Sequence, residues 1–262
     1  MKIFPHPIIK TLCLKLHNTV FHGGPNMPTA IGMEISTACN RRCHYCPQSV
    51  TPQKQKIVTR ETWERFLSRL EEIPWRGMVT FHSYNEPTIV PGFPDYVREL
   101  KSRLPHCFPL LFSNGDKPDV IDESMKAGVF LAIITEHPPF KPTWRPRIEE
   151  LEKKWGWRIR AKRLSSLHNQ AGRMKDIECE PMTKCIEAVG GMGIDVDGNM
   201  GLCCVDYEHN YRNLFGNIHE KTIKEIWFSK RAVEVRRMLA NGQPATVLCN
   251  GCFGTVGKPV PY

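Results

Sequence analysis

Three cysteines close together near the start of the chain have the spacing of cluster ligands. Cys39, Cys43 and Cys46 lie within eight residues, and a proline follows the last of them. A loop this short can bring three thiolates to one four-iron cluster, which would leave the fourth iron open to an external ligand. Zinc is the alternative, but it normally takes a fourth Cys or His nearby. The local candidate, His44, lies awkwardly between two of the thiols in the sequence.

A second group of cysteines lies in the last third of the chain. Six of the 11 cysteines follow residue 175: Cys179, Cys185, Cys203, Cys204, Cys249 and Cys252. The segment around them predicts only a hairpin with an Asp-Gly turn over residues 194–203 and a helix over 222–239, with Ile223, Ile226, Trp227 and Val233 facing the core. A unit this small gains stability from a metal centre. The isolated Cys13 and Cys107 are expected to be small buried side chains.

Composition and charge limit the classes of function. At 262 residues and 41% hydrophobic content, the chain is long enough for one α/β domain with a smaller appendage. The net charge is +9, and its densest part, residues 141–175, fits a phosphate or carboxylate substrate, an acidic redox protein or a solvated face. No aromatic and glycine pattern accompanies this basic stretch, so nucleic acid is not an expected partner.

The compartment follows from the N-terminus and from the cysteines. The apolar residues 8–16 are interrupted by Lys10 and Lys15, and no run approaches the length of a membrane span. The sequence therefore predicts a cytoplasmic protein that does not enter a membrane. Because disulfides are disfavoured in the cytoplasm, the cysteines are expected to bind metal or to take part in redox chemistry.

Alternating strands and helices must position these cysteines. Strands are expected over residues 31–36, 78–82, 108–113, 129–135 and 157–164. One helix is expected to begin within residues 59–62, and three others to cover 93–104, 120–127 and 149–155. This alternation predicts parallel pairing with right-handed crossovers. The expected fold is α/β, a partial (β/α)6 TIM-like barrel with a small C-terminal iron–sulfur domain. The expected domains are an N-terminal extension over 1–29, the barrel over 30–175 and the cysteine-rich domain over 176–262.

Polar segments follow four successive strands of the predicted barrel. The cysteine loop follows the first strand, Tyr84-Asn85-Glu86-Pro87 the second, Ser113-Asn114-Gly115 the third and Glu136-His137 the fourth. Taken singly, each is ordinary turn chemistry. Because the C-terminal ends of parallel barrel strands share one rim, the four segments are expected to converge on one pocket.

These segments resemble the motifs of the radical S-adenosylmethionine (SAM) superfamily. In that family the C-x3-C-x2-C loop carries an aromatic before its third cysteine, here Tyr45, and SAM binds the open iron. Tyr84-Asn85-Glu86-Pro87 looks like the family's Gly-Gly-Glu-Pro element, which implies that Glu86 and the neighbouring backbone meet the methionine amino group. Asn85 replaces a glycine and suits a left-handed backbone. Ser113-Asn114 resembles the family's element that lies near the ribose of SAM.

The C-terminal third resembles the SPASM and shorter Twitch extensions of this superfamily. The resemblance implies that Cys185, Cys203, Cys249 and Cys252 close a second cluster without an open iron, suited to electron transfer or structure. The adjacent Cys203 and Cys204 leave the third ligand open, and Cys179 is unassigned. The implied cofactors are two 4Fe-4S clusters and SAM.

The resemblance also implies a reaction. A 5′-deoxyadenosyl radical would remove hydrogen from a small polar substrate such as a sugar, aminocyclitol or nucleoside, and the second cluster would accept an electron, as in dehydrogenase-type oxidoreductases. Flavodoxin or ferredoxin would supply the first electron. Near residue 170 such a dehydrogenase carries an arginine where this chain has Gln170, and Arg173 is the candidate replacement. The other candidate catalytic residues are Glu136, His137 and Cys204.

Three alternatives stay open at this point. An epimerase would use Cys204 to return hydrogen to the substrate, and a peptide-modifying enzyme would act on a larger substrate. A zinc-stabilised binding module belongs to a different class and would contain no iron.

Overall fold

One parallel sheet of six strands forms the centre of the molecule. The computed structural model describes residues 27–164, 167–185, 187–211 and 214–255. The strands are β1 (Ala30–Met33), β2 (Met78–Thr80), β3 (Phe108–Ser113), β4 (Leu131–Glu136), β5 (Ile159–Arg163) and β6 (Gly191–Ile194). They lie in the order β5-β4-β3-β2-β1-β6, and every neighbouring pair is parallel. The expected partial α/β barrel is confirmed.

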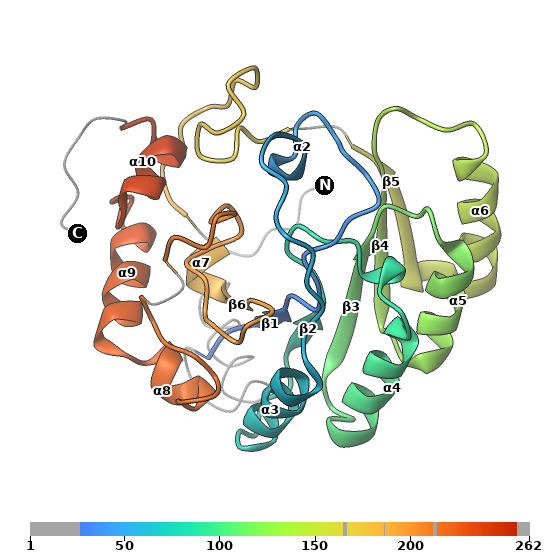
Figure 1. Ribbon diagram of the computed structural model, residues 1–262, viewed down its shortest axis with the longest axis horizontal. Helices are drawn as coiled ribbons and strands as arrows, with labels where there is room; N and C mark the ends of the chain where they lie inside the picture. Colours follow the sequence, from blue (N-terminus) through green and yellow to red (C-terminus); the bar gives the residue numbers. More distant parts are fainter. Residues whose placement is uncertain (1–26, 165–166, 186, 212–213, 256–262) are drawn as a thin grey trace, which may run out of the picture.

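Four amphipathic helices cover the outer side of this sheet. Figure 1 shows α3 (Arg60–Glu71), α4 (Phe93–Arg103), α5 (Pro118–Ala127) and α6 (Trp144–Trp155) following the strands on one side of the molecule. Thr59 caps α3 by accepting a hydrogen bond from the amide of Thr62. The predicted apolar face of α3, which includes Trp63, Phe66 and Leu70, is fully buried.

The helix α6 begins earlier than predicted. It starts at Trp144 rather than at 149, and Pro146 lies within its first turn. Proline is tolerated there because the first amides of a helix have no intrahelical acceptor. The longer α6 matters for the site because the Trp144 indole donates a hydrogen bond to the carbonyl of Asn114, 2.8 Å away.

The sixth strand comes from the cysteine-rich part of the chain. Residues 191–194 pair with β1, with Gly32 opposite Gly193. The chain then turns at Gly198, and Ile194 and Met200 form an antiparallel bridge in place of a long hairpin. The barrel and the C-terminal cysteines are therefore connected through one strand.

The predicted helix over 222–239 is two helices. α8 (Ile223–Trp227) and α9 (Lys230–Ala240) are separated at Ser229, whose hydroxyl accepts a hydrogen bond from the amide of Ala232. After this break the buried residues of α9 are Ala232, Val235 and Leu239, so Val233 is 44% exposed and the prediction that it faces the core is wrong. Ile223, Ile226 and Trp227 are buried as predicted.

The C-terminal segment packs on the barrel core. The short α7 (Glu187–Gly190) precedes β6, and α8, α9 and α10 (Val247–Phe253) lie on the opposite side of the molecule from α4 to α6 (Figure 1). One hydrophobic cluster includes Ile31 and Trp63 of the barrel and Trp227 and Phe253 of the C-terminal segment. The remaining short elements are α2 (Pro47–Val50), η1 (Pro87–Ile89) and η2 (Gly156–Arg158). None of the helices described is long and apolar enough to cross a membrane.

Candidate active site

The predicted rim segments meet around one cavity. This first cavity has a volume of about 270 Å³ and lies at the C-terminal ends of β2 to β4. All three N-terminal thiols and Tyr45 of the same loop line it, together with seven polar or aromatic residues of the other segments: His82, Ser83, Tyr84, Asn85, Ser113, Asn114 and His137. Glu86 also lines it. The sequence therefore predicted correctly that these loops converge.

Glu86 joins two of the loops. Its carboxylate accepts hydrogen bonds from the hydroxyls of Thr88 and Ser113, at 2.6 and 2.8 Å, and from the amide of Asn114 at 2.7 Å. Glu86 is 2% exposed, and burial raises its pKa even though these donors favour the charged form. The residue thereby fixes the second loop against the third, and the assignment of its carboxylate to the methionine amino group stays a prediction.

Asn85 does not have the left-handed backbone expected for a glycine replacement. It is not among the non-glycine residues with positive φ in the described part of the chain. Its side chain closes the loop instead, because Oδ1 accepts a hydrogen bond from the amide of Ser83 at 2.9 Å and Nδ2 donates to the carbonyl of Phe81 at 3.2 Å. Asparagine is thus used for its hydrogen bonds at this position.

Arg41 holds the cysteine loop in place, a role that the sequence analysis missed. Its guanidinium donates two hydrogen bonds to Asp116, of 2.7 and 2.6 Å, and one to the carbonyl of His137 at 2.8 Å. Burial opposes ionisation of Asp116, but the hydrogen bonds and charge of Arg41 outweigh it and lower the pKa of the carboxyl. An arginine inside the cysteine loop was the available signal, and its partner could not be known without the fold.

His137 lies beside the cysteine loop as well. Its Nδ1 is 2.5 Å from the hydroxyl of Tyr45, and the two rings are stacked. Burial and the nearby Arg41 lower the pKa of His137, so the imidazole is neutral near pH 7. Tyr45 and His137 thus connect the loop after β1 with the loop after β4.

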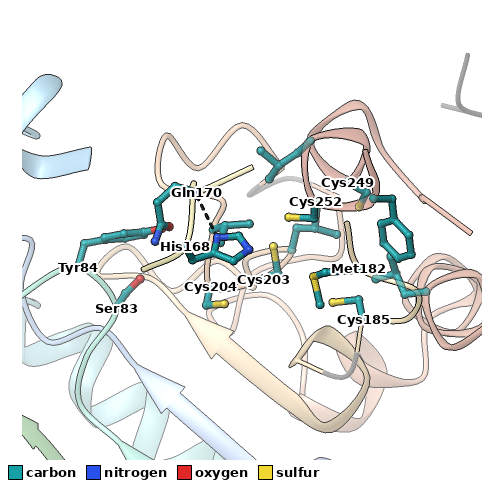
Figure 2. Close-up of a pocket in the computed structure, with 15 residues that line it drawn as sticks. Ser83, Tyr84, His168, Gln170, Met182, Cys185, Cys203, Cys204, Cys249 and Cys252 are labelled. Carbon is teal, nitrogen blue, oxygen red and sulfur yellow. Dashed lines mark hydrogen bonds between the residues drawn. The ribbon is translucent and has the colours of Figure 1, made fainter. Parts of the chain in front are cut away.

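The C-terminal cysteines line a second cavity, of about 480 Å³. Cys185, Cys203, Cys249 and Cys252 gather there. Figure 2 shows Cys185, Cys249 and Cys252 on one side of Cys203, with Cys204 on the side nearer Ser83. The rest of the lining is mostly apolar, with Met182, Leu202, Val205, Leu239, Leu248 and Phe253. Burial raises the pKa of Cys252 to about 11, and that of Cys203 rises for the same reason.

Soft sulfur donors around an apolar hollow fit an iron–sulfur cluster. In the described residues no group of three or more His, Cys, Asp or Glu side chains is close enough together to hold a single metal ion. A four-iron cluster carries each thiolate on a separate iron, so its ligands do not converge on one point. Both cysteine sets, each spread around a cavity, therefore fit a four-iron cluster.

Tyr84 and Gln170 lie between the two cysteine sites. Tyr84 lines both cavities, and its hydroxyl donates a hydrogen bond of 2.6 Å to the side-chain carbonyl of Gln170. Gln170 has a positive φ of 52°, and its amide donates to the His168 ring, as the dashed line in Figure 2 shows. Burial, with the nearby Cys204 and Cys203, raises the pKa of Tyr84, so the phenol stays neutral.

Other candidates lie further from the cavities. Glu136 is buried and accepts a hydrogen bond of 3.0 Å from Arg163, and it is absent from the lining of the cavities described for this chain. Arg173 pairs with Glu208 at 3.0 Å and lies over the Tyr207 ring, which packs against Tyr84.

The unassigned cysteines have distinct surroundings. Cys107 is buried, as expected for a small core side chain, whereas Cys13 lies outside the described residues. Cys179 accepts a hydrogen bond from the amide of Asn169 and donates one to the carbonyl of Leu167, so it shapes the loop that carries His168 and Gln170.

The fold and the two thiol-lined cavities define an iron–sulfur enzyme with a SAM-type barrel, and sequence comparison agrees. The radical SAM superfamily model matches residues 33–161, and the SPASM iron–sulfur cluster-binding domain model matches residues 185–253. The chain belongs to the radical SAM superfamily and carries a SPASM domain. As an enzyme of this kind, it binds SAM and a 4Fe-4S cluster in the barrel, and it binds further iron–sulfur clusters in the SPASM domain.

Two known proteins are similar to this chain in sequence. The SAM-dependent 2-deoxy-scyllo-inosamine dehydrogenase of Niallia circulans is 25% identical over 230 residues, which cover 85% of this chain and 91% of that protein. A protein of Pyrococcus furiosus that modifies the cofactor of a tungsten-containing aldehyde ferredoxin oxidoreductase is 32% identical over 71 residues, 27% of this chain and 20% of that protein.

Solved structures support the fold. The crystal structure of BtrN in complex with AdoMet and 2-DOIA has a TM-score of 0.76 at 24% identity, and the match covers 82% of this chain and 88% of that one. The structure of anSMEcpe with bound AdoMet and a peptide has a TM-score of 0.59 at 14% identity, with 89% and 92% covered. The boundaries predicted for the domains, at residues 29 and 175, stay predictions.

Proposed function

We propose that this enzyme is a dehydrogenase that oxidises a secondary alcohol of a small polyol, with an aminocyclitol or amino sugar as the substrate class. The observation that carries the proposal is the arrangement of three adjacent cavities. A third cavity of about 390 Å³, which we call the barrel cavity, is lined by residues of β1, β2 and β6 and shares Ser83 with both thiol-lined cavities. The similarity to the Niallia circulans dehydrogenase over most of both chains supports the same reaction type.

Each cavity has a role in this proposal. Cys39, Cys43 and Cys46 would hold the first cluster, and Tyr84, Asn85, Glu86, Ser113 and Asn114 would surround SAM. When bound, these cofactors supply a 5′-deoxyadenosyl radical that removes a hydrogen atom from a substrate carbon. The barrel cavity would hold that carbon and exclude water. Its lining includes the buried apolar side chains of Met192, Ile194 and Leu202, which would help to exclude water.

The second cluster would accept the remaining electron. Cys185, Cys203, Cys249 and Cys252 would be its ligands. We take Cys203 rather than Cys204 as the third because the charges of Cys203 and Cys249 interact, and Figure 2 shows Cys204 on the side toward Ser83. With four thiolates the cluster has no open iron, which suits electron transfer. Cys203 also lines the barrel cavity, so the cluster would lie directly beside the substrate.

Alcohol oxidation also releases a proton. His82 lines both the first cavity, beside the N-terminal thiols, and the barrel cavity. Burial lowers its pKa to about 4, so its imidazole is neutral near pH 7 and would face the substrate in that form. We assign His82 as the hydrogen-bond acceptor for the alcohol proton. Gln170, Arg173 and His137 then act by shaping the loops around the cavities.

An epimerase is the second candidate function because of one cysteine. Cys204 lines the barrel cavity, so a thiol is available to return a hydrogen atom to a substrate radical. Incubation with SAM, reductant and 2-deoxy-scyllo-inosamine in deuterated water distinguishes the two. Formation of a ketone supports the dehydrogenase, whereas an alcohol product with an inverted carbon that carries solvent deuterium rejects it in favour of an epimerase.

The electron donor we propose is an acidic flavodoxin or ferredoxin. β5 is an edge strand, and Arg160, Lys162 and Arg163 on it are exposed, as are Lys153 and Lys154 on the adjacent α6. A basic face of this kind attracts an acidic redox protein. Such donors and the thiol-ligated clusters place the enzyme in the cytoplasm in this proposal.

A further inference from the structure

Two adjacent residues between the thiol-lined cavities have a left-handed backbone. Gln170 and Ala171 have φ values of 52° and 58°, and His209 is the one other non-glycine residue with a positive φ in the described part of the chain. This conformation costs about 1–2 kcal/mol per residue, because Cβ comes too close to the following carbonyl oxygen. Such strain persists only where neighbouring contacts hold it, and it is common at functional sites. The contacts of this left-handed turn, residues 169–172, therefore indicate what it does.

One side of the left-handed turn is tied to the first cavity. Within the turn, the amide of Gly172 donates to Oδ1 of Asn169 at 3.2 Å, and the amide of Gln170 donates to Nδ1 of His168 at 3.0 Å (Figure 2). The Gln170 side chain accepts the 2.6 Å hydrogen bond from the hydroxyl of Tyr84, which lines the first cavity. This hydrogen bond connects the turn to the loop after β2.

The other side of the turn packs on the last two cysteines. Gly251 lies between Cys249 and Cys252, and a Cβ added to it would be 2.0 Å from the carbonyl oxygen of Ala171. Glycine is therefore required for this close approach of two backbones. Burial raises the pKa of the Cys252 thiol, and a hydrogen bond from the backbone of Ala171 opposes that rise. Because a thiolate can only accept, the donor is the Ala171 amide.

A hydrogen bond to a ligand sulfur changes the reduction potential of a cluster. A reduced cluster carries one more negative charge than the oxidised one, and an amide that donates to a thiolate stabilises negative charge. The bond therefore raises the potential. In the proposed reaction the substrate radical loses one electron to the second cluster and its hydroxyl proton to His82, which leaves a ketone. A higher potential of the second cluster favours this electron transfer.

We propose that Gln170 is a positioning residue for the second cluster. Its hydrogen bond with Tyr84 holds the left-handed turn in the position from which the Ala171 amide donates to Cys252, and this donation raises the potential of the cluster. The proposal rests on the ligand role proposed for Cys252, and it does not require the dehydrogenase reaction. It also links the wall of the first cavity to the second cluster through one chain of contacts.

A redox titration of the holoenzyme tests the proposal without turnover. The enzyme with both clusters is poised anaerobically at a series of potentials, and the reduced clusters are followed by electron paramagnetic resonance. Added SAM identifies the signal of the first cluster, because SAM binds its open iron. Gln170→Met keeps the length of the side chain and removes its hydrogen-bond acceptor. We expect the ratio of reduced to oxidised second cluster at a fixed potential to fall about tenfold, a shift of about 59 mV for a one-electron couple. An unchanged potential of the second cluster overturns the proposal.

A second variant shows whether the hydrogen bond acts as a unit. Tyr84→Phe keeps the aromatic ring and removes the donor of the same bond. It should lower the potential as Gln170→Met does, and the double variant should lower it no further. Additive shifts in the double variant overturn the role of this bond. Tyr84→Phe carries the test alone if Gln170→Met fails to fold.

Ala171→Gly is the matched control within the turn. Glycine keeps the amide donor and adopts a positive φ without strain, so the potential of the second cluster should equal that of the wild type. A shift as large as that of Gln170→Met would show that any change in the turn alters the potential, and it would overturn the specific role of Gln170.

The two proposals fail in different ways. Ketone formation by the wild type, together with an unshifted potential in Gln170→Met, would keep the dehydrogenase and reject the role of the turn. A shifted potential in an enzyme that forms no ketone would keep the role of the turn and reject the dehydrogenase.

Discussion

Hydrogen bonds of single residues determine how firmly the first cluster is held. The Arg41–Asp116 pair is largely buried, with 10% and 13% of the side chains exposed, and it fixes the cysteine loop against the loop after β3. Asp116→Asn would leave the buried guanidinium with a neutral partner and should cost about 1–3 kcal/mol of stability. We expect faster loss of the first cluster in air, followed as the decay of iron–sulfur absorbance.

The matched control for this variant is Glu149→Gln. It breaks the pair between Arg145 and Glu149, in which both side chains are about half exposed. An exposed pair of this kind contributes less than about 1 kcal/mol, so cluster lifetime should not change. Equal lifetimes for Asp116→Asn and the wild type would show that the pair does not support the cysteine loop.

His82, whose Nδ1 atom is shielded from solvent, makes stability depend on pH. Its folded-state pKa is about 4, below the ordinary value of 6.5, because burial disfavours the charged imidazole. As pH falls below 6.5 the unfolded chain gains a proton that the folded chain does not bind, so this residue lowers stability from pH 6.5 downward until about pH 4. His82→Gln should therefore lose less melting temperature between pH 7 and pH 5 than the wild type, measured by anaerobic differential scanning calorimetry. Parallel curves would contradict this assignment.

At the scale of elements, β6 forms part of the substrate wall. Gly193 lines the barrel cavity, and its missing side chain faces open space. Gly193→Leu should fold, because no atom lies within 4 Å of the added Cβ, and should fill part of the cavity. We expect at least about a tenfold loss of polyol binding, with iron content and SAM binding unchanged. Undiminished polyol binding would show that the substrate lies elsewhere.

The alternation of elements could be predicted from the sequence, but the interior of the barrel could not. The strands and helices up to β5 follow from apolar runs, caps and Gly128, so their order and type are correct. β6 was missed because its sequence is Gly-Met-Gly-Ile, which has little strand propensity without the neighbouring β1. The break at Ser229 was missed because a serine inside an apolar period does not end a helix by itself.

The site residues also fall into those that could be predicted from the sequence and those that could not. Loop residues such as Cys39, Glu86 and Ser113 were found because they follow strands in recognisable motifs. Glu34, His82 and His209 of the barrel cavity were missed as site residues because they meet only through strand pairing and chain reversal. Burial patterns within a single strand do not show which side of a barrel is hollow.

At the scale of the whole molecule, charge distribution should control reduction. The exposed basic residues of β5 and α6 would steer an acidic donor, and salt screens such attraction. The rate of reduction by flavodoxin should fall severalfold between low and high ionic strength in stopped-flow measurements. Reduction by dithionite is the control for salt effects on the cluster. A charge reversal at Arg160 and Lys162 should slow the flavodoxin reaction alone, and an unchanged rate would reject this face as the docking surface.

The central claim concerns the open iron of the first cluster. Electron–nuclear double resonance on the anaerobic, reduced holoenzyme, with SAM labelled with ¹⁷O in its carboxylate, tests it most directly. If Cys39, Cys43 and Cys46 leave one iron open, the label should show hyperfine coupling to the cluster. A reduced cluster without ¹⁷O coupling in the presence of saturating SAM, or zinc in place of iron, would contradict it.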